Sequence, residues 1–234
     1  MKVGIDNGHG LNVPGKRSPC GTLREWQFNY ATAKYLKEEL KRCKIDYVML
    51  SDTEADTSLS DRVKKCKREN CDLLVSIHAN AYKGTEFGTW GGTETYAYKK
   101  GGTGDKYAQN IQAEMVKTSK LRDRGVKYDS LYIVRESHCP AVLVEAAFMD
   151  NKQELNLLKS ESFRKQTAKA IAKGICKTAN IKYIEETTND SNTSDDILYR
   201  VIAGSFKDKS NAERQLNKLK ELGISGVFLE ARRG

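Results

Sequence analysis

Proline, tryptophan and histidine are scarce in this chain of 234 residues, which contains three, two and three of them respectively. No uncharged apolar run is long enough to cross a bilayer. The N-terminal segment MKVGID begins a strand at once, without the apolar core of a secretory signal. Zinc-finger and aromatic-rich RNA-binding motifs are also missing. We therefore expect a chain that is synthesised in the cytoplasm and has neither a membrane nor a nucleic acid as its partner.

Cysteine occurs six times, at positions 20, 43, 66, 71, 139 and 176, but never as a C-x-x-C pair. Cys66 and Cys71 are poorly spaced for a zinc knuckle. Without a signal peptide, buried and reduced thiols are expected in place of a disulfide framework. The formal net charge of +9 favours a polyanionic partner such as nucleic acid, an anionic membrane or a cell wall bearing teichoic acid, and charge alone does not choose among these.

Apolar strands alternate with amphipathic helices along most of the chain. The pattern predicts strands at 2–6, 46–50, 72–79, 91–98 and 141–148, and helices at 22–44, 60–69, 105–119 and 162–178. Ser60 is the expected N-cap of the second helix. Near-continuous apolar strands between helices indicate an α/β fold, with a mostly parallel twisted sheet and helices on both faces.

The composition changes abruptly at residue 185. Residues 185–196 read EETTNDSNTSDD, with five acids, no bases and nothing apolar, which is typical of a linker. From residue 197 the pattern resumes as strand, helix and strand, at 198–206, 210–223 and 225–231. We therefore expect a main domain at 1–184, an acidic linker at 185–196 and a small β-α-β appendage at 197–234, which is short for an independent core.

Two of the three histidines follow predicted strands. His9 comes after the first strand, in the motif D-N-G-H-G, and His78 lies at the end of the strand at 72–79. Since the carboxyl ends of parallel strands meet at one edge of a sheet, these imidazoles are expected in one site. His138 precedes its strand and is therefore not expected there. Two carboxylates join the set: Glu25 opens the first long helix, and Glu145 lies towards the carboxyl end of the strand at 141–148.

Two imidazoles and one carboxylate are a common ligand set for catalytic zinc, with a fourth position open to water. A further glutamate beside that water can act as a general base. The same residues have structural interpretations as well. A single histidine is usually a surface group or a satisfied core group, Glu25 suits the first turn of a helix, and Glu145 in an apolar strand suits a buried salt bridge.

Four stretches together resemble the N-acetylmuramoyl-L-alanine amidases of the Amidase_3 type: GIDNGHG, the glutamate at position 25, SLSDRVKKCKRENCDLLVSIHANA and PAVLVEAAFMDNKQE. The resemblance covers roughly residues 1–180, and Leu11 stands where the family motif usually has a glycine. It implies a zinc ion on His9, Glu25 and His78, and a catalytic role for Glu145. The implied reaction is hydrolysis of the amide between N-acetylmuramic acid and L-alanine in peptidoglycan, with lysis of the wall.

Two other functions remain open at this point. One is a zinc peptidase that cuts within the stem peptide, since a zinc ion with three protein ligands and a glutamate base is also peptidase chemistry. The other is a wall-binding protein without activity. Without a signal, the chain is expected to reach the wall after release, by a holin as a phage endolysin or by lysis of a mother cell as an autolysin.

The C-terminal segment resembles the first half of a SPOR-type peptidoglycan-binding repeat. The matching residues are YRVIAGSF at 199–206 and NAER at 211–214. The chain ends after one strand, helix and strand, whereas the usual repeat continues. We therefore expect the segment at 197–234 to bind the wall, to pair with a second copy as a homodimer, or to dock on the main domain.

Overall fold

A six-stranded sheet forms the centre of the main part of the protein. The computed structural model describes residues 1–186, 204, 206–224 and 227–229, and it divides the chain into two compact units, 1–186 and 187–234. The strands of the first unit are β1 (Lys2–Asp6), β2 (Asp46–Met49), β3 (Leu73–Asn80), β4 (Thr93–Ala97), β5 (Asp123–Tyr128) and β6 (Ala141–Phe148). Their spatial order is β2-β1-β3-β6-β4-β5.

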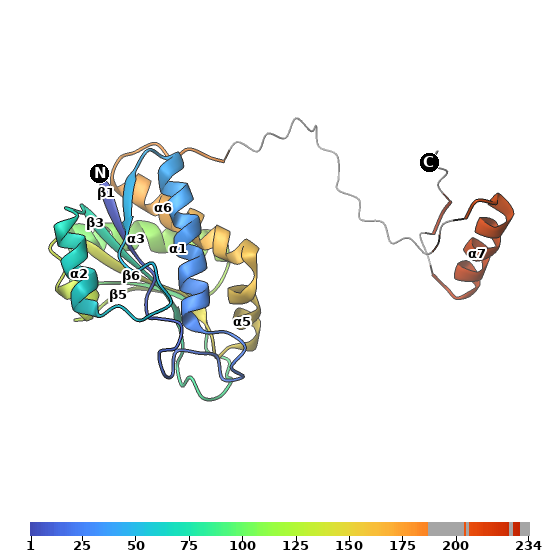
Figure 1. Ribbon diagram of the computed structural model, residues 1–234, viewed down its shortest axis with the longest axis horizontal. Coiled ribbons are helices and arrows are strands. Elements are labelled where there is room, and N and C mark those ends of the chain that lie inside the picture. Colours follow the sequence, from blue (N-terminus) through green and yellow to red (C-terminus); the bar gives the residue numbers. More distant parts are fainter. Residues whose placement is uncertain (187–203, 205, 225–226, 230–234) are drawn as a thin grey trace. The chain divides into compact units, whose positions relative to one another are not determined.

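Helices cover both faces of this sheet. They are α1 (Glu25–Arg42), α2 (Leu59–Arg68), α3 (Thr103–Ser119), α4 (Tyr132–Arg135), α5 (Lys152–Lys159) and α6 (Glu161–Thr178). Figure 1 shows α1, α5 and α6 on one side of the sheet and α2 on the other. The expected α/β fold with helices on both faces is therefore confirmed.

The strands β2, β1, β3 and β6 run parallel to one another, and β4 pairs with β6 in the antiparallel sense. The sheet is thus mostly parallel, as predicted. The long loops 7–24 and 81–92 follow β1 and β3 and leave the same edge of the sheet (Figure 1). That edge is where the carboxyl ends of the parallel strands meet, and it is the edge at which α/β proteins build their sites.

Alternate residues of the strands pack into two separate hydrophobic cores, because neighbouring side chains on a strand point to opposite faces of the sheet. Val75 and Val144 pack into the larger core with α1, α3 and α6. Leu74 and Leu143 pack into a smaller core that contains Cys66 of α2 and residues of α4. The second face is therefore covered more thinly than the first.

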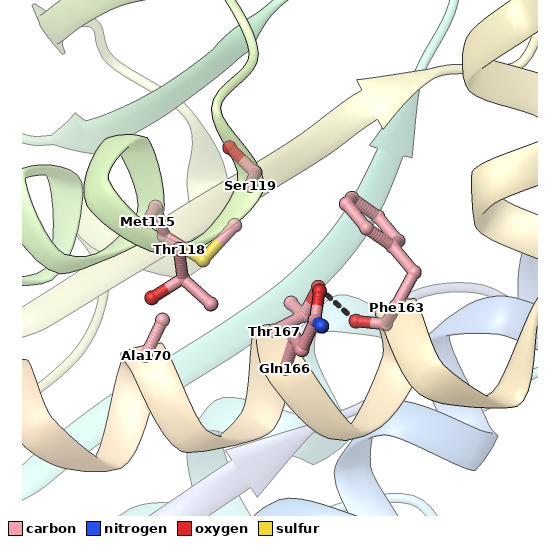
Figure 2. A pocket seen from close by; sticks show the side chains of 7 residues that line it. All are labelled: Met115, Thr118, Ser119, Phe163, Gln166, Thr167 and Ala170. Carbon is pink, nitrogen blue, oxygen red and sulfur yellow. Dashed lines mark hydrogen bonds between the residues drawn. The ribbon is translucent and has the colours of Figure 1, made fainter. Parts of the chain in front are cut away.

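The contact between α3 and α6 is close because α6 carries a glycine at the crossing. A Cβ atom at Gly174 would lie 2.5 Å from the Cα of Ile111. Further along the same contact, Figure 2 shows a shallow depression beside Met115, where Thr167 donates a hydrogen bond of 2.8 Å to the carbonyl of Phe163. Its polar atoms do not converge on a common point, so we attribute the depression to helix packing and not to a ligand.

The predicted helix starts differ from the observed ones by one to three residues, and hydrogen bonds explain two of these differences. The first helix begins at Glu25 and not at 22, since the side chain of Gln27 accepts a hydrogen bond from the N–H of Arg24 and closes the first turn. The second helix begins at Leu59, and its N-cap is Ser58, whose hydroxyl accepts from the N–H of Asp61, so the prediction of Ser60 as the cap is wrong.

The pattern did not predict β5, α4 or α5. The strand β5 has the sequence DRGVKY, is half-buried or exposed, and lies at the edge of the sheet, so it lacks an apolar alternation. The helix α4 is a single turn, and α5 has only eight residues. Short elements of this kind give a weak periodic signal.

In the second unit the structure describes one helix, α7 (Lys209–Glu221), close to the predicted 210–223. The predicted strands at 198–206 and 225–231 lie mostly outside the described residues, as does most of the predicted linker. Glu185 still belongs to the first unit, where it forms ion pairs of 2.7 Å with Lys169 and Lys173. No helix among the described residues combines the length and the apolar character needed to cross a membrane.

A buried ion pair fastens α2 to the sheet. Arg62 and Asp6 are each 1% exposed, and the distance from Arg62 Nη1 to Asp6 Oδ1 is 2.6 Å. Arg62 also donates to the carbonyl of Thr57 at 2.7 Å, and Asp56 accepts from its second terminal nitrogen at 3.1 Å. A buried charge needs such partners, since an uncompensated one is costly.

We predict that Arg62→Leu lowers the free energy of unfolding by about 3–5 kcal/mol, because Asp6 is left buried without its cation. Denaturant unfolding of the full chain measures this. The matched control is Lys165→Ala, which removes an exposed ion pair with Glu161 and should change stability little. A similarly small effect of both substitutions would contradict the role given to the buried pair.

Candidate active site

His9, Glu25 and His78 come together at the carboxyl edge of the sheet. His9 lies in the loop after β1, Glu25 is the first residue of α1, and His78 lies near the end of β3. The distance from His78 Nδ1 to Glu25 Oε1 is 2.8 Å, and that from His9 Nε2 to Glu25 Oε2 is 3.5 Å. One donor atom from each residue lies within 4.8 Å of the others.

The loop that carries His9 has an unusual backbone. A Cβ atom at Gly8 would lie 2.4 Å from Cε1 of His78, so this position must be glycine for the loop to approach β3. His9 itself has a φ of 56°, in the left-handed region that non-glycine residues seldom adopt. Asn29 of α1 donates to the carbonyl of Gly8 at 3.3 Å. The tight turn thus directs the His9 imidazole towards Glu25.

Glu25 is 2% exposed and has several hydrogen-bonding neighbours. Besides His78, its Oε1 accepts from the N–H of Ala79 at 3.3 Å and from the amide of Asn29 at 3.5 Å. Burial alone would raise the pKa of Glu25, but the hydrogen bond from His78 and the charges of both histidines lower it to about 2. The carboxylate is therefore ionised throughout the neutral range, as a metal ligand must be.

The two imidazoles differ in their electrostatic surroundings. Burial lowers the pKa of His9 to about 4, although the charge of Glu25 opposes this shift. Burial would also lower the pKa of His78, but the hydrogen bond and the charge of Glu25 outweigh it and raise that pKa. His9 is thus neutral at physiological pH. His78 and Glu25 share a proton, and a bound cation would displace that proton.

This donor set fits a zinc ion. Two imidazole nitrogens and one carboxylate oxygen are the ligands zinc accepts in catalytic sites, at about 2.0–2.2 Å. Donors held at such distances lie roughly 3–3.5 Å from one another. The 3.5 Å between His9 Nε2 and Glu25 Oε2 is in that range, and the 2.8 Å between His78 Nδ1 and Glu25 Oε1 is the shorter distance of a hydrogen bond. The structure brings the three predicted residues into one cluster, and their role as ligands stays a prediction.

Glu145 lies on β6 directly beside His78 of β3, because the two positions are paired in the parallel register. Its Oε2 is buried and has no hydrogen-bond partner within the described part of the chain. Burial raises the pKa of Glu145 to about 8; the charge of His78 opposes the shift, and those of Glu25 and Glu94 add to it. Within residues 1–186 Glu145 forms no ion pair, so the salt bridge considered for it is not found there.

Polar residues that the sequence did not single out as site residues surround the cluster. Asp6 accepts from the Ser76 hydroxyl at 2.6 Å, and Ser76 Oγ lies 3.1 Å from His78 Nε2, which connects the buried Arg62 pair to the site. On the other side of Glu145, Glu94 pairs with Arg124 at 2.7 Å. Polar residues inside apolar strands, as in LLVSIHA and TETYA, are the signal that would have found Ser76 and Glu94.

His138 lies at the amino end of β6 and outside this cluster, as the sequence argument expected. The cysteines all carry free thiols. Cys66 and Cys139 have their sulfur atoms 3.8 Å apart beside His138, a grouping that the sequence analysis did not foresee.

The pKa of Glu145 predicts a pH dependence for the metal-free protein. A carboxyl group whose pKa rises from 4.5 to about 8 on folding stabilises the fold fully below the ordinary value, and this contribution is lost as the pH rises towards 8. The melting temperature of the metal-free chain should therefore fall, relative to that of Glu145→Gln, between about pH 4.5 and 8. If the melting temperatures of the two proteins instead changed with pH in parallel over this range, the raised pKa would not belong to Glu145.

Comparison with solved structures places the fold among wall amidases. The catalytic domain of CwlV, an N-acetylmuramoyl-L-alanine amidase from Bacillus (Paenibacillus) polymyxa var. colistinus, superposes with a TM-score of 0.72 and 30% identity, over 78% of this chain and 99% of that domain. An N-acetylmuramoyl-L-alanine amidase from Clostridium difficile 630 gives the same TM-score with 34% identity, over 77% of this chain and 97% of that one.

The sequence comparison leads to the same family. The chain is 30% identical over 232 residues to the sporulation-specific N-acetylmuramoyl-L-alanine amidase of Bacillus subtilis. The aligned region covers 98% of this chain and 84% of that protein. Residues 164–230 match the SPOR domain, a range that begins within α6. Residues 3–177 match the N-acetylmuramoyl-L-alanine amidase family, Amidase_3, and the chain belongs to that family.

Proposed function

We propose that this protein hydrolyses the amide bond between N-acetylmuramic acid and L-alanine in peptidoglycan, with His9, Glu25 and His78 holding a zinc ion and Glu145 as the general base. The observation that carries the proposal is a cluster of three zinc-type donors within 4.8 Å, beside a glutamate with an unpaired carboxylate oxygen on the next strand. Membership of the amidase family supports the choice of bond.

A zinc ion held by His9, Glu25 and His78 would supply Lewis acidity, which would polarise the scissile carbonyl and make a water molecule more acidic. The residues of the chain have separate tasks around it. Glu25 is fixed by its hydrogen bonds to Ala79 and Asn29, so it presents one orientation of its carboxylate. Ser76 and Asp6 orient the His78 ring from the opposite side.

Glu145 has the properties of a general base. Its raised pKa of about 8 in the metal-free protein means that it holds a proton strongly, and a nearby cation would lower that pKa towards neutrality. It can then accept a proton from water and return it to the leaving amine of L-alanine. Its unpaired Oε2 is the atom available for both transfers.

Two relatives, an amidase and an endolysin, suggest how the chain would reach its substrate. Besides the sporulation-specific amidase, the endolysin of Bacillus phage SPP1 is 33% identical over 182 residues, which span 77% of this chain and 66% of that protein. We propose that this chain lyses the cell wall after release. We propose two alternative routes for that release, which are a holin and the lysis of a mother cell.

The bond cleaved is tested on purified peptidoglycan. We predict that digestion releases stem peptides with a new N-terminal L-alanine and creates no new reducing sugar end. Chelation should abolish this release, and added zinc should restore it, because the site provides three protein ligands for one ion. A new N-terminus within the stem peptide would show a zinc peptidase, and undiminished release from demonstrably metal-free protein would contradict the zinc mechanism.

For the C-terminal segment we propose wall binding or self-association through residues 197–234. The helix α7 has no fully buried residue, and its apolar stripe at Ala212, Leu216 and Leu219 is only half-buried within the described part of the second unit. Apolar surface of this kind is normally covered. A second copy of the segment would cover it across a two-fold axis.

Truncation after residue 186 tests this proposal, since Glu185 and the contacts of the first unit are then retained. We predict that the full chain is dimeric by light scattering, that the truncated chain is monomeric, and that the truncated chain sediments less with purified walls. If the full chain is monomeric but sediments with walls more than the truncated chain does, the segment binds the wall and the homodimer is excluded.

A further inference from the structure

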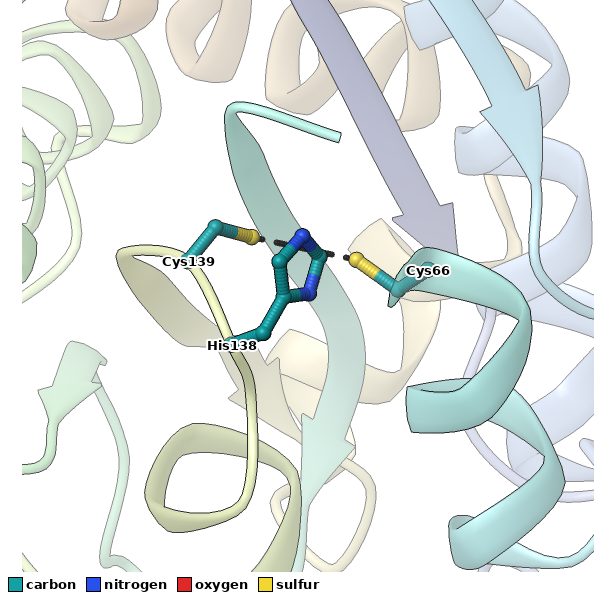
Figure 3. Close-up of side chains that lie close together, drawn as sticks. All are labelled: Cys66, His138 and Cys139. Atoms are coloured by element: carbon teal, nitrogen blue, oxygen red, sulfur yellow. Dashed lines mark hydrogen bonds between the residues drawn. The ribbon is translucent and has the colours of Figure 1, made fainter. Parts of the chain in front are cut away.

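A second cluster of metal-binding side chains lies at the opposite end of the sheet from the amidase site. Cys66 is in the last turn of α2, and His138 and Cys139 lie in the loop before β6. One donor atom from each lies within 4.8 Å of the others. Figure 3 shows the imidazole of His138 in front of the line that joins the two sulfur atoms. Glu145 lies further along β6, towards its carboxyl end, so the two clusters are separate.

The spacing of the sulfur atoms suits a shared ion. Cys66 Sγ and Cys139 Sγ are 3.8 Å apart. Two thiolates bound at about 2.3 Å to one tetrahedral zinc ion are separated by roughly 3.8 Å. The same distance fits a thiol hydrogen bond, so the sulfur pair alone does not decide between the two. The adjacent imidazole favours the metal site, because it adds a third donor of the type that zinc prefers.

The surroundings of the cluster also fit an ion. Cys66 is fully buried, whereas His138 is exposed and gives access from solvent. Ser137 Oγ lies 3.4 Å from both the backbone nitrogen and the sulfur of Cys139, which holds that side chain in place. A third thiol is close by, since Cys66 Sγ and Cys71 Sγ both lie 3.2 Å from the point that a Cβ of Gly4 would occupy.

We propose that Cys66, His138 and Cys139 form a second zinc site, which links the end of α2 to the loop before β6. On binding, the two thiols each lose a proton to solvent and the imidazole binds in its neutral form, so the ion replaces two protons. The two linked segments lie more than 70 residues apart in the sequence, and Figure 3 shows that these three side chains lie between them. The site is structural and does not depend on the amidase activity proposed above.

Cobalt titration of the full chain, reduced and freed of metal, tests the site. A thiolate bound to Co²⁺ gives a charge-transfer band in the near ultraviolet, whereas a site made of His9, Glu25 and His78 contains no sulfur and gives none. We expect this band to saturate at about one equivalent of bound thiolate-ligated cobalt per chain, as one three-ligand site implies. Its absence from the reduced wild-type chain would overturn the proposal.

Variants identify the ligands. Cys139→Ser should abolish the band, and His138→Asn, at an exposed position that should fold normally, should weaken cobalt binding by roughly tenfold or more. The matched control is Cys20→Ser, which removes an exposed cysteine outside the cluster and should leave the band unchanged. Loss of the band in this control, or its full retention in both cluster variants, would refute the assignment.

Zinc gives a second readout that is independent of activity. At a hundredfold excess over its dissociation constant, zinc should raise the melting temperature of the wild type by roughly 5–10 °C more than that of Cys139→Ser. The wild type should also carry one more zinc per chain than this variant. A Cys66–Cys139 disulfide in the freshly isolated chain, together with equal zinc contents of the two proteins, would show a redox pair in place of a metal site.

Discussion

Four carboxylates gather at the carboxyl edge of the sheet, and the cost of burying their charges governs the structure around them. Asp6 is compensated by Arg62, and Glu94 by Arg124, Asn80 and Tyr96. Glu25 is compensated by two imidazoles. Glu145 alone among these four retains an oxygen without a partner in the described structure. A proton or a nearby cation is what can stabilise it, and this connects the electrostatics of the fold directly to general-base chemistry.

The sheet register determines which of these groups can meet. Because β3 and β6 are parallel neighbours, His78 and Glu145 lie side by side although they are 67 positions apart in the sequence. The carboxyl-end rule was enough to predict from sequence that His9 and His78 share an edge and that His138 does not. The apolar strands and long helices were predictable for the same reason, since burial imposes a strict period on them.

What sequence could not predict depends on contacts between distant segments. The buried pair of Arg62 and Asp6 joins a helix to a strand, and neither residue differs locally from an ordinary surface charge. The edge strand β5 has little burial to impose a pattern. The approach of Cys66 to Cys139 arises only when α2 packs beside α4 and the loop before β6, so spacing in the sequence gave no indication of it. Both clusters thus rely on the same helix, which fixes Arg62 near one site and Cys66 at the other.

The central claim is that Glu25 is a zinc ligand and Glu145 is the general base. One comparison of two variants tests it most directly. Zinc content, melting temperature and wall-lysis rate are measured for Glu145→Gln and Glu25→Gln. The account predicts that Glu145→Gln retains the zinc and melts no lower than the wild type while lysis slows by roughly a hundredfold or more. It also predicts that Glu25→Gln loses one zinc. Wild-type lysis with a sharply lowered melting temperature in Glu145→Gln would contradict it and make Glu145 a structural residue.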